Sequence, residues 1–439
     1  MALTPNNVHE TLSQHLLTDG YDIVCDLEKS RGCWLHDAKS GRDFLDMFTF
    51  FATLPLGFNH PALMETEFLK KLTRAAITKV SNSDIYTLEY AEAIDIFGRV
   101  AIPEELPHVF FIEGGALGVE NALKAAFDWK VKKNFARGIT GEKGYQVIHF
   151  KNAFHGRSGY TLSLTNTADP RKYQYFAKFD WPRIDTPALA FPVTAQNLAN
   201  TKQAEAKAVD QIHAALKQNP HDIAAIIIEP IQSEGGDNHF RPEFLKALRT
   251  ICDEHEMLLI FDEVQTGIGL TGTMWAYQQL GVVPDLLAFG KKTQVCGVLA
   301  GKRLDEITNN VFTESSRINS TFGGNLVDFV RVGKILEVIE RDNLLANAQK
   351  IGGYLLAELQ KLSAKHPSIT NARGRGLLCA IDLPSTDERN RVIDKCYDLG
   401  MIILPCGTRS IRFRPALTVT EKEINLAVEI LQKAVKAHV

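Results

Sequence analysis

The sequence predicts an α/β protein with a mostly parallel sheet and a second, smaller α+β unit at its C-terminal end. From Pro61 onward, short apolar runs alternate with helical patterns, which is typical of strand–helix–strand units. The runs are too short and too rich in β-branched or aromatic residues to be helices, as expected for buried parallel strands. The pattern changes beyond Phe322, and 439 residues are too many for one compact core.

Residues 1–60 form the first predicted unit. Within it, the runs 33–36 and 44–47 flank a turn of sequence Asp-Ala-Lys-Ser-Gly at 37–41. Two short runs around such a turn predict a small antiparallel pair of strands.

Residues 61–321 form the second unit, which carries the parallel sheet. The predicted strands are 108–112, 145–150, 223–229, 258–262, 285–289 and 295–300. Helical periodicity lies between them, near 115–133, 203–217 and 241–256.

Residues 322–439 form the third unit, which is smaller and of α+β type. One long helical stretch over about 324–364 leads into short strands at 377–382, 401–405 and 410–414. A last helix begins near 421.

Composition excludes several classes of protein. With 45% hydrophobic and 23% charged residues and a net charge of −3, the chain has neither the basic field of a nucleic-acid-binding protein nor a polybasic membrane patch. No apolar run approaches the roughly 18 residues of a membrane span, and residues 1–7 lack the features of a signal peptide. Seven scattered cysteines without C-x-x-C pairs indicate neither zinc nor a disulfide framework, so we expect no metal and a cytoplasmic location.

An acid and a lysine end two neighbouring predicted strands. Asp262 closes the run 258–262, and Lys291 follows the run 285–289. Ligands of open α/β sheets bind beyond the carboxyl ends of the strands, so both residues are expected to face one site. A buried carboxylate and a lysine suit pyridoxal phosphate (PLP), since the lysine can bind it covalently and the acid can pair with its pyridine nitrogen.

Each of these residues has a simpler interpretation. Alone, Asp262 is more often a helix-capping or loop acid, and Lys291 a solvated lysine at a strand end. Lys292 is a rival for the covalent role. Adjacent residues of an extended chain point to opposite sides, so only one of the two lysines can face the cofactor.

Two further loops could bind parts of such a cofactor. Gly114-Gly115-Ala116 joins a strand to a helix, where backbone N–H groups can bind phosphate; a tight turn without ligand is equally consistent. Phe154 and Arg157 follow the strand 145–150 and could stack on a ring and clamp a carboxylate. A packed phenylalanine and a surface arginine are the alternative, and His155 between them receives no role.

Acids and arginines also occur at the ends of other runs. Glu229 ends the predicted strand 223–229 and Glu234 follows it, whereas Arg412 and Arg414 alternate with apolar residues. Pairing between the two groups is one interpretation; a solvated edge strand that carries both arginines is the other.

The segment Gly267–Gly272 matches G-x-G-x-x-G in form only. A dinucleotide-binding turn needs its first glycine almost directly after the strand and a helix at its third. Glu263–Thr266 intervene here, so we do not predict a nucleotide site.

Over nearly its whole length, the chain resembles the class III aminotransferases of PLP fold type I. The signature runs from Asp262-Glu263 through Asp285-Leu286-Leu287 to Gly290-Lys291. The resemblance implies a large domain with a seven-stranded, mostly parallel sheet, and a homodimer with its active site at the subunit interface. It is strongest with members that transfer the ε-amino group of L-lysine to 2-oxoglutarate, giving 2-aminoadipate 6-semialdehyde and glutamate. Another ω-aminotransferase, for ornithine, 4-aminobutyrate or a diamine, is the alternative.

The resemblance also implies which residues bind the cofactor. Lys291, not Lys292, holds PLP, and Asp262 pairs with its pyridine nitrogen. The remaining contacts are the ring of Phe154, Gln265 near the phenolic oxygen, the backbone N–H groups of Gly115 and Ala116 at the phosphate, and Thr321, which reaches the phosphate from the other subunit of the dimer.

For the substrate, the resemblance implies that Arg157 binds the carboxylate distal to the reacting amine. Glu234 pairs with Arg412 as a gate, and Asn319 contacts the substrate. The chain departs from many relatives at two places. Its phosphate turn has no hydroxyl residue, and Ser233 stands where a glycine usually precedes the gate glutamate.

Overall fold

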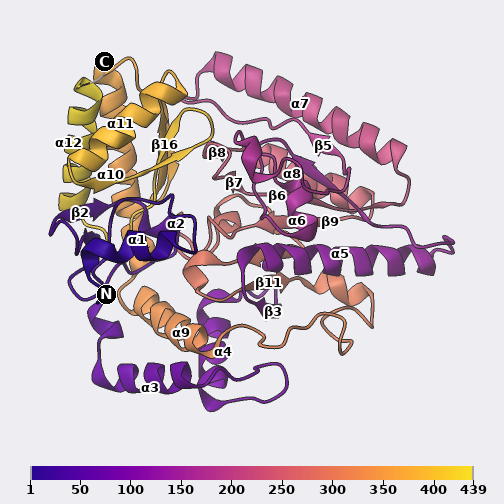
Figure 1. The fold of residues 1–439 in the computed structure, drawn as a ribbon. Helices are drawn as coiled ribbons and strands as arrows, with labels where there is room; N and C mark the ends of the chain where they lie inside the picture. Colours follow the sequence, from indigo (N-terminus) through magenta and orange to yellow (C-terminus); the bar gives the residue numbers. More distant parts are fainter. Residues whose placement is uncertain (1, 438–439) are drawn as a thin grey trace.

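A computed structural model describes residues 2–437, which fold around a central sheet with a second group of elements at one side (Figure 1). The predicted units that begin at residue 1 and end at residue 439 each include residues outside this range. No helix within the described residues is both long and apolar enough to cross a membrane.

The central sheet has seven strands, and it is mostly parallel, as predicted. Only β11 runs antiparallel to its neighbours β10 and β3. The order across the sheet is β3 (His108–Ile112), β11 (Cys296–Ala300), β10 (Leu286–Phe289), β9 (Leu258–Asp262), β6 (Ile223–Ile228), β4 (Gln146–Phe150) and β5 (Arg183–Ile184). Six of these match the predicted runs; β5, with two residues, is too short to give an apolar pattern.

Helices cover both faces of this sheet, which explains why its inner strands are buried at every position. Ile227 and Ile260 belong to the core with α5 (Gly115–Ala136). Ile226 and Leu259, one residue earlier in each strand, belong to the core with α7 (Ala195–Gln218) and α8 (Pro242–Glu254). Successive side chains of each strand therefore pack alternately into the two apolar layers, one on each face of the sheet.

The C-terminal elements form an antiparallel sheet of four strands with helices beside it, shown in yellow in Figure 1. Its order is β12 (Thr370–Arg375), β13 (Leu378–Asp382), β16 (Ser410–Phe413) and β15 (Leu404–Cys406). Because β16 pairs on both sides and Arg412 and Arg414 are both buried, their interpretation as residues of a solvated edge strand is wrong. The helices are α10 (Leu344–Lys365), α11 (Thr386–Asp398) and α12 (Glu421–Lys436).

The single helical stretch predicted over about 324–364 is two helices, α9 (Leu326–Arg341) and α10. Asn343 between them has φ of 50°. A residue in the left-handed region ends a right-handed helix, and asparagine tolerates it better than most side chains. The apolar periodicity continues through the break because both helices contribute to the same core.

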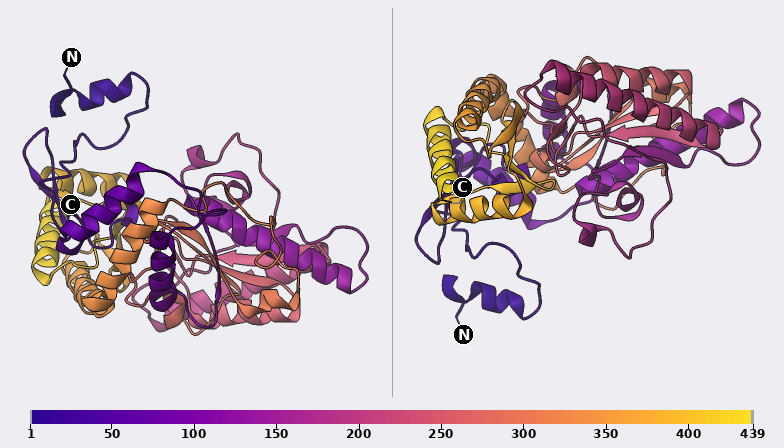
Figure 2. Two further views of the ribbon diagram at one scale, coloured as in Figure 1. Left: turned by 90° about the horizontal axis from the view of Figure 1, so that it is seen from below. Right: turned by 90° about the horizontal axis from the view of Figure 1, so that it is seen from above.

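The N-terminal antiparallel pair, β1 (Trp34–His36) and β2 (Asp43–Asp46), forms as predicted. A third strand, β14 (Met401–Ile402), joins it in parallel with β2. The pairing with β14 joins β2 to the last third of the chain. The helix α1 (Val8–Ser13) stands apart from the body (Figure 2). Other short elements are α2 (Thr49–Ala52), α3 (Thr66–Ile77), α4 (Leu88–Ala101), α6 (Gly159–Leu164), β7 (Ile231–Gln232) and β8 (Asn238–His239).

Two adjacent glycines of α10 provide a test of how this helix packs. A Cβ at Gly352 would lie 2.0 Å from the backbone carbon of Gly376 in the β12–β13 turn, whereas a Cβ at Gly353 meets nothing within 4 Å. We expect Gly352→Ala to lower the thermal unfolding midpoint, because backbone would have to move. Gly353→Ala should raise it slightly, since alanine favours a helix by about 1 kcal/mol over glycine. Equal midpoints for the two variants would contradict this close approach.

Candidate active site

The carboxyl ends of the parallel strands meet at a cavity of about 510 Å³. This is the edge where ligands of open α/β sheets bind. Arg412 reaches the same cavity from β16 of the small sheet. The predicted site residues that line it are Gly115, Ala116, Phe154, Arg157, Glu234, Asp262, Gln265, Lys291 and Arg412.

A larger cavity of about 740 Å³ lies beside the outer half of α5. Aromatic and charged side chains line it, among them Phe127, Trp181 and Arg317. None of the predicted site residues lines this larger cavity. The size of a cavity therefore does not identify the site; the site is identified by the functional side chains that meet in the smaller cavity.

Asp262 is the last residue of β9, and its carboxylate is buried. One oxygen accepts a hydrogen bond from the backbone N–H of Val264 (3.1 Å). The other lies 2.8 Å from Nδ1 of His155, which is also buried. A buried carboxylate needs hydrogen-bond partners, and His155 holds the carboxylate of Asp262 in position.

Lys291 follows β10 in a tight turn, η5 (Lys291–Thr293), and its φ is 55°. We predicted that the two lysines point to opposite sides of an extended chain, but the segment is a turn and is not extended. The turn itself directs their side chains to different places. Lys291 lines the cavity, while Nζ of buried Lys292 donates to the carbonyl oxygen of Gln265 (2.7 Å). Burial, and then the positive charge of Arg412, lower the pKa of Lys291 to about 8. A lowered pKa makes the neutral, nucleophilic amine accessible near neutral pH.

The first turn of α5 begins directly after β3, where Gly114 has φ of 97°. Helix geometry leaves the N–H groups of Gly115 and Ala116 without intrahelical partners, and the helix dipole favours an anion there. The chain after β4 packs closely on this turn, since a Cβ at Gly156 would lie 2.6 Å from the Cβ of Ala116. The turn therefore offers backbone N–H groups, and no hydroxyl side chain, to an anion.

Phe154 is held by its backbone, whose N–H donates to Glu229 (3.0 Å). Glu229 also accepts from the backbone N–H of Ser233 (3.0 Å). Burial raises the pKa of Glu229 to about 7. Through these bonds a single acid at the end of β6 fixes both the loop with the aromatic ring and the loop with Glu234.

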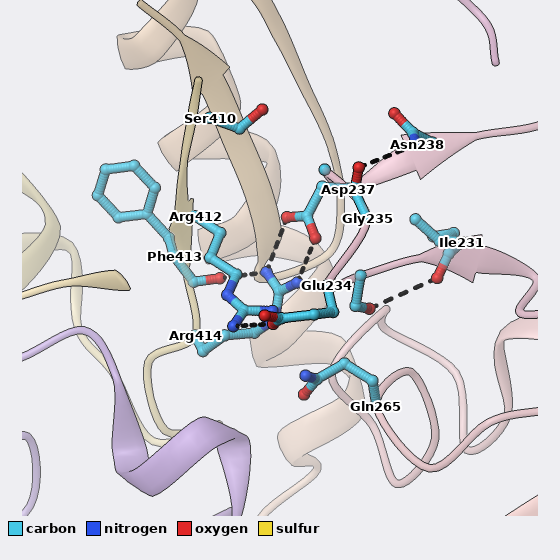
Figure 3. Close-up of polar contacts among 12 residues, drawn as sticks. Ile231, Glu234, Gly235, Asp237, Asn238, Gln265, Ser410, Arg412, Phe413 and Arg414 are labelled. Atoms are coloured by element: carbon cyan, nitrogen blue, oxygen red, sulfur yellow. Dashed lines mark hydrogen bonds and ion pairs between the residues drawn. The ribbon is translucent and has the colours of Figure 1, made fainter. Parts of the chain in front are cut away.

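Two acid–arginine pairs join the loop after β7 to β16 (Figure 3). Arg414 and Asp237 are fully buried and form a two-bond pair, at 2.5 and 3.0 Å. Arg412 is 2% exposed, and its Nη2 donates to Glu234 at 2.7 Å. Nε and Nη1 of Arg412 are buried and have no partner within residues 2–437. Within the described residues, Arg414 leaves only Nε without a partner, whereas Arg412 keeps two nitrogens free for another acceptor.

The residues of the cavity fit PLP. The α5 turn suits its phosphate, Asp262 its pyridine nitrogen and Lys291 its aldehyde carbon. Gln265 has a buried Oε1 without a partner in the described part of the chain, so a hydrogen-bonding group of a ligand can satisfy it.

Three predicted substrate or cofactor residues lie further out. Arg157 is exposed but lines the cavity. Asn319 and Thr321 are exposed on the loop before α9. Among the described residues, those that line this chain's cavity do not include either of them. Their assigned roles stay predictions, and Thr321 was predicted to act on the other subunit.

The cavity also contains residues to which sequence reasoning assigned no role. Phe51, from the left-handed turn Thr49–Ala52, lies with its ring 5.8 Å from Nζ of Lys291. His155 could have been suspected, since it stands between two predicted contacts. Lys172 contacts Glu234 from a separate loop, and nothing in its sequence surroundings indicates this.

Comparison with known proteins agrees with this geometry. The Aminotransferase class-III family model matches residues 17–435. L-lysine-epsilon aminotransferase of Mycobacterium tuberculosis is 54% identical, over 98% of this chain and 96% of that protein. The enzyme of the same name from Streptomyces clavuligerus is 51% identical, over 99% of this chain and 95% of that protein.

A solved structure described as lysine aminotransferase from M. tuberculosis in the internal aldimine form superposes with a TM-score of 0.98. The two chains are 53% identical, and the match covers 100% of each. With a family model over most of its length and relatives of this identity, the chain belongs to the class-III aminotransferases.

Proposed function

We propose that this aminotransferase moves the ε-amino group of L-lysine to 2-oxoglutarate, giving glutamate and 2-aminoadipate 6-semialdehyde. The similarity to lysine-epsilon aminotransferases over nearly the whole chain supports this choice of donor. The observation that carries it is the cavity itself. It has one arginine at its mouth, Arg157, and one beside the lysine at its base, Arg412, which Glu234 neutralises.

The chain's own residues hold the cofactor in this proposal. PLP, when bound, withdraws electrons from the substrate carbon that carries the amino group. Asp262, fixed by His155, keeps the pyridine nitrogen protonated, and Phe154 covers the ring. The N–H groups of Gly115 and Ala116 bind the phosphate, and Thr321 of the second subunit completes that site in a homodimer.

L-Lysine enters with its ε-amine first. Arg157 binds the α-carboxylate at the mouth, with Asn319 as a further contact. Because Glu234 neutralises Arg412, the base of the cavity does not attract a carboxylate, and the α-amine has no reason to enter first. Nζ of Lys291 then removes a proton from the ε-carbon of lysine and carries it away from that carbon during the rearrangement.

2-Oxoglutarate differs from lysine in carrying a carboxylate beside its reacting carbon. In this half of the reaction Glu234 releases Arg412, whose free donors bind that carboxylate. Arg157 takes the distal carboxylate. The same two arginines therefore serve both substrates, and the pairing state of Arg412 distinguishes them. The cytoplasmic location expected from the sequence remains part of this proposal.

The donor is tested with isotopically labelled lysine. With 2-oxoglutarate as acceptor, L-lysine labelled with ¹⁵N at the ε-position should give labelled glutamate, and lysine labelled at the α-position should give unlabelled glutamate. Ornithine, 4-aminobutyrate and a diamine in the same assay test the alternative ω-aminotransferase. Label transfer from the α-position, or a faster reaction with one of these donors, would contradict the proposed function.

The two adjacent lysines give a matched pair of variants. Lys291→Ala should lose both the visible absorbance of bound PLP and turnover, because its Nζ is the amine that binds the cofactor covalently and carries the proton in this proposal. Lys292→Met keeps the buried volume, so it should retain the absorbance while losing the bond to Gln265. Absorbance spectra of both proteins, with far-UV circular dichroism as the folding control, decide between them. The reverse pattern would assign the covalent role to Lys292.

Asp262→Asn should still bind PLP but react slowly. An amide cannot keep the pyridine nitrogen protonated, so we expect the single-turnover rate with lysine to fall by about 100-fold or more. The absorbance of bound PLP serves as the control for cofactor content. A rate close to that of the wild-type protein would remove Asp262 from this role.

A further inference from the structure

Glu234 has a second cationic partner besides Arg412. One carboxylate oxygen of Glu234 accepts from Nη2 of Arg412 at 2.7 Å, and the other accepts from Nζ of Lys172. The two cations come from different parts of the fold. Arg412 lies on β16 of the small sheet, and Lys172 ends the short helix η3 (Pro170–Lys172) in the loop after α6. The carboxylate is therefore held from both sides of the cavity.

The backbone of Glu234 is fixed on both sides of the residue. Its carbonyl oxygen accepts from the N–H of Gly407 (2.8 Å), and the N–H of Ser233 donates to Glu229 (3.0 Å). A Cβ at Gly235 would lie 2.1 Å from the carbonyl oxygen of Asn152, so the chain is tightly packed there too. The backbone of Glu234 is therefore held in place, and release of Arg412 is left to movement of the two side chains.

Burial makes an unpaired carboxylate costly in this position. Burial alone would raise the pKa of Glu234, but the charges of Arg412 and Lys172 and their hydrogen bonds outweigh it, so the pKa is lowered. If Arg412 were the only partner, its release would leave a charged carboxylate without compensation in a largely buried site. Lys172 provides that compensation and is itself only 27% exposed.

We infer that Lys172 is a positioning residue of the gate: it keeps the Glu234 carboxylate paired while Arg412 turns to the carboxylate beside the reacting carbon of the acceptor. The number of cationic partners of Glu234 thus falls from two to one, and its carboxylate is never left unpaired. This role rests on the proposed function. It predicts that Lys172 favours the dicarboxylate substrate and is nearly neutral for L-lysine, which leaves the Glu234–Arg412 pair closed.

A double-mutant cycle with a non-reacting dicarboxylate tests this role. Glutarate has two carboxylates and no group that reacts, so calorimetric titration of the PLP-loaded dimer measures the binding step alone. Lys172→Met should weaken glutarate binding by about tenfold in the wild-type background. In the Glu234→Gln background, where Arg412 is already free, the same substitution should change binding by less than about twofold. An equal loss in both backgrounds would show that Lys172 binds the dicarboxylate directly, and it would overturn the inference.

Arg171 offers a matched control for simple loss of positive charge. It precedes Lys172 in η3, is 82% exposed and pairs with Asp169 instead of Glu234. Arg171→Met should leave glutarate binding unchanged, and Lys172→Arg should restore most of the affinity that Lys172→Met loses. If Arg171→Met weakened binding as much as Lys172→Met, the effect would be one of general charge, and the inference would fail.

The single-turnover rate with L-lysine separates this inference from the proposed function. Lys172→Met should keep that rate within about twofold, because the closed pair is retained. A proportional loss with lysine and with 2-oxoglutarate would indicate a structural role and contradict the inference. If the wild-type protein does not take nitrogen from lysine at all, the proposed function fails, whatever the glutarate cycle gives. Lys172→Gln serves as the second variant if Lys172→Met does not fold.

Discussion

The carboxyl edge of the parallel sheet is the constraint on which the rest of the site depends. Parallel strands all end on the same side, so the residues after β3, β4, β6, β9 and β10 are brought together although they are far apart in the chain. The antiparallel strand β11 contributes as well, because its short connection from β10 forces the turn that holds Lys291. Helices on both faces make this edge rigid, and a rigid edge is what a preorganised site requires.

Charge balance in the cavity follows from how each group is buried. Asp262 is held by His155, and Arg414 pairs with Asp237 through two of its nitrogens. Arg412 is different, because two of its three nitrogens have no partner within residues 2–437. Buried arginine nitrogens without partners are costly unless a ligand uses them. Through the free donors of Arg412, the small sheet takes part in substrate selection in the proposed function.

The small sheet and the N-terminal segment complete a site that the large sheet begins. β16 presents Arg412 to the cavity, and Arg414, the residue directly after β16, pairs with Asp237. Phe51 comes from a left-handed turn near β2, and β2 in turn pairs with β14. Elements from the beginning, the middle and the end of the chain therefore meet at one cavity.

The sequence by itself determined the α/β class, six strands of the central sheet and the positions of Asp262 and Lys291 at strand ends. These follow from local signals: uniform apolar runs, and polar residues that end them. Tertiary structure decided the rest. The break at Asn343 lies inside a continuous apolar pattern, and β16 is central only because β13 and β15 flank it. The contacts His155–Asp262 and Lys172–Glu234 join residues that lie far apart in the sequence. The sequence does not predict these pairs, because contacts between distant loops depend on how the loops fold and not on spacing along the chain.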